Sequence, residues 1–282
     1  MNSGLKSGFE AAVSSGYSAA KARQGFLKGL LNGFGPTLGD NDKVQDFTIQ
    51  QGVDMPSFAW LADYSAVSSA GNITAVVNQT NSGVSFSVGS DPAYSLDVNG
   101  IRGSAQFDSN DRIYNSSLLG GINSCTIMML VKVTGPSNAR ILFSKYSSYT
   151  FPGTGDILID CDADGTIRSQ FYGASGFSII TANVTPNEWY LITAKYDLSQ
   201  SKGIGSEQSF SINRVRQTNF TTQTFTASGS NFSSSACTFG NHAGAYQGGA
   251  SVACGVIYPY SLNSSQQVRT ENFLKRYYGL KF

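Results

Sequence analysis

Charged residues are scarce in this chain. Only 13% of its 282 residues are Asp, Glu, Lys or Arg, against about 25% in an average soluble protein. The charges also nearly cancel, with 19 Lys and Arg against 18 Asp and Glu. Because the chain lacks a large basic field that could gather phosphates, we do not expect it to bind nucleic acid.

Long apolar runs are absent as well. No apolar run approaches the roughly 18 residues that a membrane-spanning helix needs, so no transmembrane segment is expected. The N-terminus also lacks the apolar stretch of about 7–15 residues and the small-residue cleavage site of a secretory signal. The sequence therefore predicts a soluble protein without a signal peptide.

Side chains that bind transition metals are few. The chain has one His and four Cys, and no two Cys form a CxxC pair. A zinc site built from Cys and His is therefore disfavoured. Each Cys lies in an apolar, strand-like run, where a free thiol behaves as a small hydrophobic group. We expect buried free thiols, not disulfides, at Cys125, Cys161, Cys237 and Cys254.

Residues 1–35 carry a helical pattern. Apolar residues recur about every four positions along one stripe, and glycines repeat at the same spacing. Each interior Gly destabilises a helix by roughly 0.5–1 kcal/mol relative to Ala, so we expect this helix to form against a partner surface. A flexible arm and a membrane-bound amphipathic helix are the alternatives. The residues expected to contact the partner are Leu5, Phe9, Val13, Tyr17, Gly25, Leu27, Gly29, Leu31 and Gly33.

The amino-acid composition and its pattern along the chain change after a linker that ends near residue 45. Short runs rich in Val, Ile, Phe, Tyr and Thr alternate with Gly, Ser, Asn and Asp up to about residue 260. This spacing favours an antiparallel β-sandwich over βαβ units. A short helix follows, with an S-x-x-Q capping box from Ser264 to Gln267 and Gly279 at the C-cap. Its expected apolar contacts are Val268, Phe273, Leu274, Tyr277 and Tyr278. We therefore predict an arm over residues 1–45 and a mainly β domain over residues 46–282.

Several motifs follow one another in residues 56–282, with Trp60 and Trp189 at strand positions expected to pack in the core. These are PSFAWLADYSAVSSAGNITAVVNQTNSG, NGIRGSAQFDSNDRI, CTIMMLVKV, DILIDCDADGTIRSQFY, NEWYLITAKYD and GGASVACGVIYPYSLNSSQQVRTENFLKRYYGL. Their order resembles the concanavalin A-like (laminin G-like) jelly roll, in which two curved antiparallel sheets pack face to face. That fold is found in lectins, glycan-processing enzymes, adhesion modules and phage virion proteins, so the resemblance does not settle the function.

A catalytic acid pair would mark a glycan-processing member of this family. Its glycosidases resemble one another in an E-x-D-x-x-E strand, on which alternate carboxylates share one face and flank the scissile bond. Beyond the arm this chain has only Glu188, Glu207 and Glu271, and none has a second acid at that spacing. We therefore predict that the protein is not an enzyme.

Three acidic residues form a D-x-D-x-D-G motif with Gly165, namely Asp160, Asp162 and Asp164. The motif matches the first half of an EF-hand loop, in which alternate oxygens bind calcium. Position twelve is Phe171 instead of the bidentate Glu, and Asp-Gly between two strand-like runs is also a hairpin signal. A hairpin turn and a calcium site both stay open, and no other cofactor is expected.

Aromatic and amide residues in two expected loops are the candidate glycan-binding groups. Sugar sites combine aromatic ring faces with amide or carboxylate groups, and such residues occur at Tyr146 and Tyr149 and again at His242, Tyr246 and Gln247. The alternative is that these side chains only cover the edge of the sandwich.

The main functional prediction combines the arm with the fold. An arm without a signal, followed by one jelly roll rich in Ser, Gly, Asn and Thr, suits a non-enzymatic structural or adhesion component of a phage virion, capsid- or tail-associated. Phage proteins leave the cell by lysis, which accommodates such a fold without an export signal. Residues 1–35 would bind other virion proteins in a homo-oligomeric or larger assembly, and the sandwich would face host-surface glycans. The alternative is a carbohydrate-binding, lectin-like module.

Overall fold

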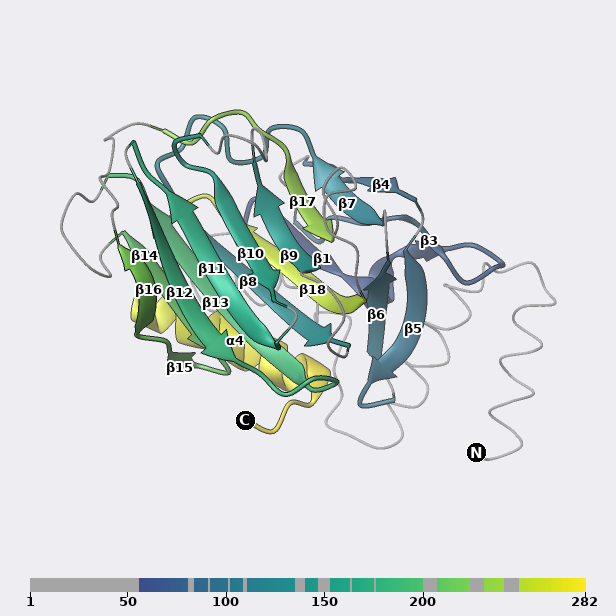
Figure 1. The fold of residues 1–282 in the computed structure, drawn as a ribbon. Coiled ribbons are helices and arrows are strands. Elements are labelled where there is room, and N and C mark those ends of the chain that lie inside the picture. The colour runs from purple at the N-terminus through teal and green to yellow at the C-terminus, as the bar shows by residue number, and fades with distance from the viewer. Residues whose placement is uncertain are drawn as a thin grey trace.

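A computed structural model shows two β-sheets stacked face to face, with one helix behind the first sheet (Figure 1). The predicted arm and linker, residues 1–45, lie outside the described residues, so the domain boundary and the arm's partner contacts stay predictions. The structure describes residues 56–80, 84–90, 92–100, 102–108, 111–134, 140–146, 153–162, 164–174, 176–199, 207–223, 231–240 and 249–282.

The first sheet contains the longest strands. Its members are β1 (Phe58–Leu61), β5 (Ala93–Val98), β6 (Arg102–Phe107), β8 (Ser124–Val133), β13 (Trp189–Asp197), β14 (Gln208–Ile212), β15 (Val215–Arg216) and β18 (Ala250–Tyr258). They lie in the order β15-β14-β13-β8-β18-β6-β5, and β1 pairs with β18. The last strand of the chain is therefore in the middle of this sheet.

The second sheet follows the order β16-β12-β11-β10-β9-β17-β7-β4. Its members are β4 (Ser87–Gly89), β7 (Arg112–Asn115), β9 (Arg140–Lys145), β10 (Ile157–Cys161), β11 (Thr166–Tyr172), β12 (Phe177–Asn183), β16 (Asn219–Gln223) and β17 (Cys237–Gly240). A 3₁₀ turn η1 (Ala62–Tyr64) and a small pair, β2 (Ala66–Val67) and β3 (Ile73–Ala75), follow β1. Because neighbouring strands pair antiparallel in both sheets, the predicted antiparallel sandwich is confirmed.

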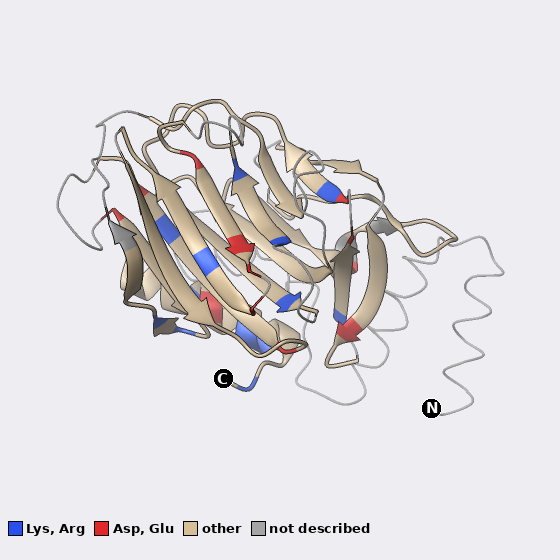
Figure 2. Cartoon of the chain, in the orientation of Figure 1, with Lys and Arg blue, Asp and Glu red and all other residues tan. Residues whose placement is uncertain are grey.

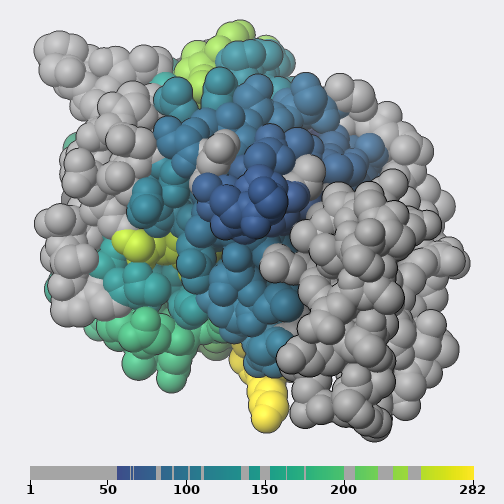
Figure 3. All heavy atoms as spheres, turned by 90° about the vertical axis from the view of Figure 1, so that its right-hand side faces the viewer, coloured from purple at the N-terminus to yellow at the C-terminus, as the bar shows by residue number. Residues whose placement is uncertain are grey.

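Both sheets carry few charges, and Figure 2 shows basic and acidic residues interspersed along the strands. Seen from the end at the right of Figure 1, the described surface is built mainly from the first strands of the domain, coloured purple to blue in Figure 3.

The inner core is organised around one aromatic ring. Phe239 on β17 lies 5.2 Å from the ring of Phe143, 6.1 Å from Trp60 and 6.3 Å from Phe58, measured between ring centroids. All four side chains are fully buried between the sheets. Trp60 is therefore the core residue that the sequence predicted. Trp189 is half-buried and packs against a second core cluster on the outward face of its sheet, so it lies at the edge of that cluster and not between the two sheets.

Helix α4 (Ser264–Tyr278) covers the outward face of the first sheet. It is capped one residue earlier than predicted, because Asn263 keeps an extended backbone and its side-chain oxygen accepts the N–H of Gln266 at 2.9 Å. Gly279 adopts φ 64°, as expected for the C-cap glycine. Of the five expected apolar contacts, four are buried and Val268 alone is wrong, because its side chain is 47% exposed.

The second apolar cluster fills the space beneath α4. It includes Phe273, Leu274 and Tyr278 from the helix and Met128 and Val256 from β8 and β18. Among the described residues, no helix is both long and apolar enough to cross a bilayer. Since α4 shields only the first sheet, the described helical structure leaves the outward face of the second sheet uncovered.

The four cysteines are free and buried, as predicted. Burial raises the pKa of Cys237 and Cys254 to about 12 and that of Cys161 to about 11, and it also raises the pKa of Cys125. Because the thiolate is the reactive form, we expect alkylation of the native protein at pH 8 to be at least about a hundredfold slower than that of an ordinary thiol. Mass spectrometry after iodoacetamide treatment checks this. All four thiols should react in denaturant, and rapid native labelling would contradict the expectation.

Candidate functional site

The outward face of the second sheet carries the candidate site. Along β10, Ile157 and Ile159 belong to the inner core, so Leu158 and Asp160 point to the opposite face, because successive side chains of a strand alternate. On the neighbouring strand β11 the same alternation turns a polar and aromatic series outward, namely Arg168, Gln170 and Tyr172.

Strand pairing arranges these outward side chains in rows across the sheet. Asp160 on β10 pairs with Arg168 on β11, and Leu158 pairs with Gln170. One step further along β11, Tyr172 pairs with Phe177 on β12. The rows therefore run from an ion pair, through an amide, to aromatic rings.

An aromatic cluster occupies one end of this face and consists of Tyr146, Tyr172 and Phe177. The ring centroids of Tyr146 and Tyr172 are 5.8 Å apart at an angle of 89°, and those of Tyr172 and Phe177 are 5.6 Å apart at 34°. Tyr146 is buried, whereas Tyr172 and Phe177 are half-buried. The buried ring of Tyr146 thus supports Tyr172, while Tyr172 and Phe177 keep part of their surface exposed.

A chain of hydrogen bonds continues from the aromatic cluster. The hydroxyl of Tyr172 donates to Oε1 of Gln170 at 3.1 Å. Nε2 of Gln170 in turn donates to both carboxylate oxygens of Asp160 at 3.3 Å. The amide of Gln170 therefore has a fixed orientation between the ring and the carboxylate.

Arg168 completes this polar network. Its Nε donates to Oδ1 of Asp160 at 3.1 Å and its Nη1 donates to Oδ2 of Asp162 at 2.8 Å, while Nη2 contacts the second oxygen of Asp160. Burial raises the pKa of Asp160, and the hydrogen bonds from Arg168 and Gln170 oppose that rise. The guanidinium is thus fixed by two carboxylates at the edge of the site.

The D-x-D-x-D-G motif forms the turn between β10 and β11. Oδ1 of Asp164 accepts the N–H of Thr166 at 2.8 Å, and Gly165 adopts φ +86°, which favours glycine. Asp160 and Asp162 bind Arg168, which supplies the positive charge that calcium would otherwise bring. In the part of the chain that the structure describes, no group of three or more His, Cys, Asp or Glu could hold a metal. The hairpin interpretation thus describes the motif, and calcium binding stays a prediction.

Of the residues predicted to bind glycan, Tyr146 belongs to this face. The others lie outside the described residues: Tyr149, His242, Tyr246 and Gln247. Sequence reasoning missed the outward residues Arg168, Gln170, Tyr172 and Phe177. Their signal is the alternation of core and non-core residues on the two strands that follow the Asp-Gly turn.

The three glutamates beyond the arm do not lie on this face. Glu188 precedes β13 and its carboxylate accepts the hydroxyl of Tyr190 at 2.9 Å. Glu207 directly precedes β14 of the first sheet, and Glu271 lies on α4. The absence of enzymatic activity stays a prediction.

The fold is similar to those of several solved toxin domains. The receptor-binding domain of botulinum neurotoxin type G matches with a TM-score of 0.53 and 13% identity, over 79% of this chain and 52% of that chain. The receptor-binding domain of a type C/D mosaic matches with a TM-score of 0.52 and 11% identity, over 79% and 52%. That of botulinum neurotoxin D matches with 0.51 and 11%, over 84% and 54%.

This likeness concerns the fold alone, because the sequence identities are low. The chain spans about half the length of the toxin domains it matches. No protein-family model matches the chain, and no curated protein matches it.

Proposed function

We propose that this chain is a carbohydrate-binding module whose glycan site is the outward face of the second sheet. The observation that carries the proposal is the aromatic cluster beside the Gln170–Asp160–Arg168 network. A sugar ring has an apolar face of C–H groups and an edge of hydroxyls. Aromatic rings next to a few fixed polar groups are the combination that binds both parts.

The polar groups of this face are held before any ligand arrives. Gln170 is fixed between Tyr172 and Asp160, and Arg168 is fixed between Asp160 and Asp162. Groups that are already ordered lose little side-chain entropy on binding, which raises affinity. The network therefore favours recognition of one arrangement of hydroxyls.

The toxin domains support a binding role, because all three are described as receptor-binding domains. They lend no support to the predicted virion role, which stays a prediction together with docking by the arm. The surface chemistry described above, and not the likeness of fold, carries the proposal.

The test is a glycan array probed with the full chain and with two tyrosine variants. Tyr172→Ala removes the central ring of the aromatic cluster and should weaken glycan binding at least about tenfold. Tyr114→Ala is the matched control, because Tyr114 is a half-buried tyrosine on the same face of β7. Tyr114 lies four strands, or about 19 Å, from β11, the strand that carries Tyr172. We expect it to bind like the unmodified protein.

A thermal unfolding curve of each variant separates lost binding from lost structure. Should Tyr172→Ala lower the stability, Phe177→Ala serves as the second variant, since it removes the outer ring of the cluster. Failure of the full chain to bind any glycan would contradict the proposal. So would equal binding by the cluster variants and the unmodified protein.

A further inference from the structure

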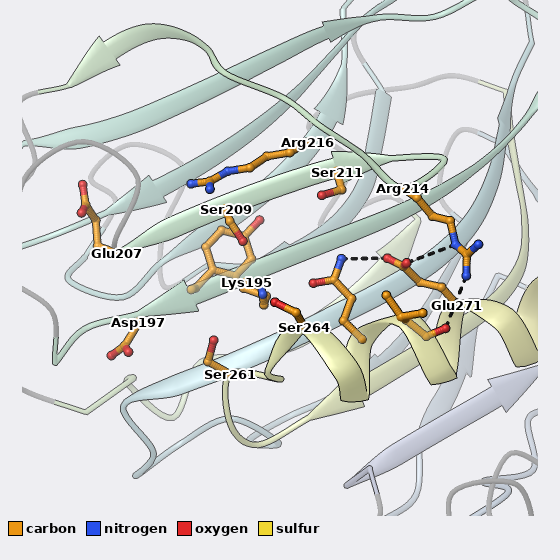
Figure 4. Close-up of a pocket in the computed structure, with 13 residues that line it drawn as sticks. Lys195, Asp197, Glu207, Ser209, Ser211, Arg214, Arg216, Ser261, Ser264 and Glu271 are labelled. Atoms are coloured by element: carbon orange, nitrogen blue, oxygen red, sulfur yellow. Dashed lines mark hydrogen bonds and ion pairs between the residues drawn. The ribbon is translucent and has the colours of Figure 1, made fainter. Parts of the chain in front are cut away.

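A second candidate site lies on the first sheet, in a cavity between the start of α4 and the strands β13, β14 and β15 (Figure 4). The cavity has a volume of about 510 Å³, within the range of about 300–1,000 Å³ of small-molecule sites. Its walls combine charged side chains with serine hydroxyls, and these two sets of groups together indicate which class of ligand fits.

The formal charges of the lining cancel. Three basic and three acidic residues line the cavity, namely Lys195, Arg214, Arg216, Asp197, Glu207 and Glu271. Burial lowers the pKa of Lys195, the charge of Arg216 lowers it further, and Glu271 opposes the shift, so these charges act on one another. A ligand with a net charge of either sign therefore meets no excess of opposite charge here.

The carboxylate beside the helix already has partners. Oε1 of Glu271 accepts the hydroxyl of Thr193 at 2.7 Å and the amide of Gln267 at 2.8 Å. Its Oε2 is 3.5 Å from Nε of Arg214, and Figure 4 shows this ion pair beside α4. The charges of Arg214 and Glu271 therefore compensate each other.

The other acids and Arg216 have partners as well. Oδ1 of Asp197 accepts the backbone N–H of Ser199 at 2.9 Å and its hydroxyl at 2.5 Å, within the turn that follows β13. Glu207 is buried, and both Glu207 and Arg216 have interaction partners of their own. None of these three residues therefore carries a charge that needs a ligand of opposite sign.

Serine hydroxyls remain open between the charged groups. Ser209 pairs with Lys195 across β13 and β14, and Ser211 follows two residues later on the same face of β14. Ser261 and Ser264 belong to the segment that enters α4. None of these four hydroxyls has a hydrogen-bond partner in the described part of the chain. Ser211 is buried, so its hydroxyl depends on the contents of the cavity for a partner.

Lys195 and Gln267 add further donors and an acceptor. Nζ of Lys195 donates to the carbonyl oxygen of Leu262 at 3.2 Å, which is its single hydrogen bond among the described residues. An ammonium group has three donors, so two are left for a ligand. Nε2 of Gln267 is bound to Glu271, whereas its Oε1 accepts no hydrogen bond from the described residues. The cavity thus offers donors and acceptors together, without an excess of charge.

The apolar part of the lining is aliphatic. The side chain of Val268, which is exposed, forms part of the wall. The ring of Tyr196 belongs instead to the inner core, where its centroid is 5.0 Å from that of Phe171 and its hydroxyl is 2.7 Å from Oγ of Ser169. Among the described residues of the lining, no aromatic ring is therefore open to a flat ligand such as a nucleobase.

We propose that this cavity binds a neutral monosaccharide. A sugar ring without a charged group leaves the ion pairs of the lining intact. Its hydroxyls both donate and accept hydrogen bonds, as the serine hydroxyls do, and its C–H face packs against Val268. The proposal is independent of the glycan site on the second sheet, because it rests on residues of the first sheet and α4.

The test is a calorimetric titration of the full chain with glucose, galactose and mannose. At least one of these sugars should bind, and its binding should persist in Tyr172→Ala, which lacks the central ring of the site on the second sheet. The amino sugar and the uronic acid of the same configuration are then titrated. Both should bind at least about tenfold more weakly, because their charges find no counter-ion in the lining.

Serine variants locate the bound sugar. Ser209→Ala combined with Ser211→Ala removes two open hydroxyls and should weaken binding at least about tenfold. Where a thermal unfolding curve shows that this variant is unstable, Ser264→Ala replaces it and should weaken binding several-fold. Ser265→Ala is the matched control, because Ser265 is an exposed neighbour on α4 that does not line the cavity. It should leave the affinity unchanged.

Three results would overturn the proposal. They are the failure of all three neutral sugars to bind, binding of a charged sugar as tight as that of its neutral counterpart, and unchanged affinity in the serine variants. Loss of binding in Tyr172→Ala would assign the sugar to the second sheet and would also overturn it. Binding of a neutral sugar here by a chain that binds no arrayed glycan would support this site and contradict the proposed function, so the two proposals fail separately.

Discussion

Replacing Asp63 by Ala should lower the free energy of unfolding by about 3–5 kcal/mol. Asp63 lies in η1 and is buried among groups from three other elements. Its Oδ1 accepts the N–H of Gly103 at 2.6 Å and the hydroxyl of Tyr94 at 3.3 Å. Its Oδ2 accepts the hydroxyl of Tyr277 at 2.9 Å and lies 3.6 Å from Nη1 of Arg102. One carboxylate thus joins η1, two strands and α4.

The large effect comes from the cation that remains. Arg102 is buried, its Nε donates to the carbonyl oxygen of Tyr277 at 3.0 Å, and its guanidinium lies 3.9 Å from the centroid of that ring. Without Asp63 the buried guanidinium of Arg102 has lost its counter-ion, in a site that little water reaches. A buried charge without its partner costs more than the intact pair contributes.

Urea denaturation followed by fluorescence measures this loss. Asp63→Asn keeps an acceptor for Gly103 but not the charge, so it should destabilise the protein less than Asp63→Ala does. Asp162→Ala is the control, because Asp162 pairs with an arginine at a 42% exposed position and should contribute at most about 1 kcal/mol. Equal losses for Asp63→Ala and Asp162→Ala would show that the buried network does not act as described.

Phe239→Ala should also destabilise the sandwich by about 3–5 kcal/mol, because it empties the centre of the aromatic core. The ring of Phe239 contacts aromatic rings from both sheets. The space for it is left by a glycine on β18: a Cβ at Gly255 would lie 2.4 Å from the Phe239 ring. Gly255, which has no side chain, therefore makes room for the large ring of Phe239.

This complementarity gives the second part of the same experiment. Gly255→Ala alone should cost about 1–3 kcal/mol through overpacking. Combined with Phe239→Ala it should cost less than the sum, because the added methyl group enters the cavity. The unfolding midpoints of the four proteins in this cycle provide the measurement. Strict additivity would contradict the proposed contact, and Phe177→Ala, on the outward face, should be tolerated better than Phe239→Ala.

Strands could be predicted where apolar and polar residues alternate along the sequence, or where a strong turn residue marks the end of the strand. The strand-like run after the Asp-Gly hairpin signal is the strand β11, Thr166–Tyr172, because that turn fixes its start and core residues alternate along it. The helix start was misplaced by one residue, since Asn263 and Ser264 both accept the N–H groups of a helix and only backbone geometry decides between them.

The candidate sites could not be read from the sequence to the same degree. Tyr146 was recognised as an aromatic loop residue, but its contact with Tyr172 depends on how β9, β10 and β11 pair. Strands of the first sheet are apolar on both faces, because one face meets the inner core and the other meets the cluster beneath α4. Alternation therefore does not show which face of these strands points inward. A cavity beside α4 combines residues of β13, β14 and β15 with helix residues more than 60 positions later, so it forms only after the first sheet and the helix are in place.

The position of β18 has a consequence for biosynthesis. This strand lies between β8 and β6 and also pairs with β1, yet in the sequence it follows all the other described strands. The strands β8 and β6 are synthesised before β18, so the edges that pair with β18 in the folded sheet have no partner strand until then. Such distant pairings slow folding, so the nascent chain holds unpaired strand edges until β18 has been synthesised. Stop codons before residue 250 should therefore yield aggregating fragments instead of smaller folded domains.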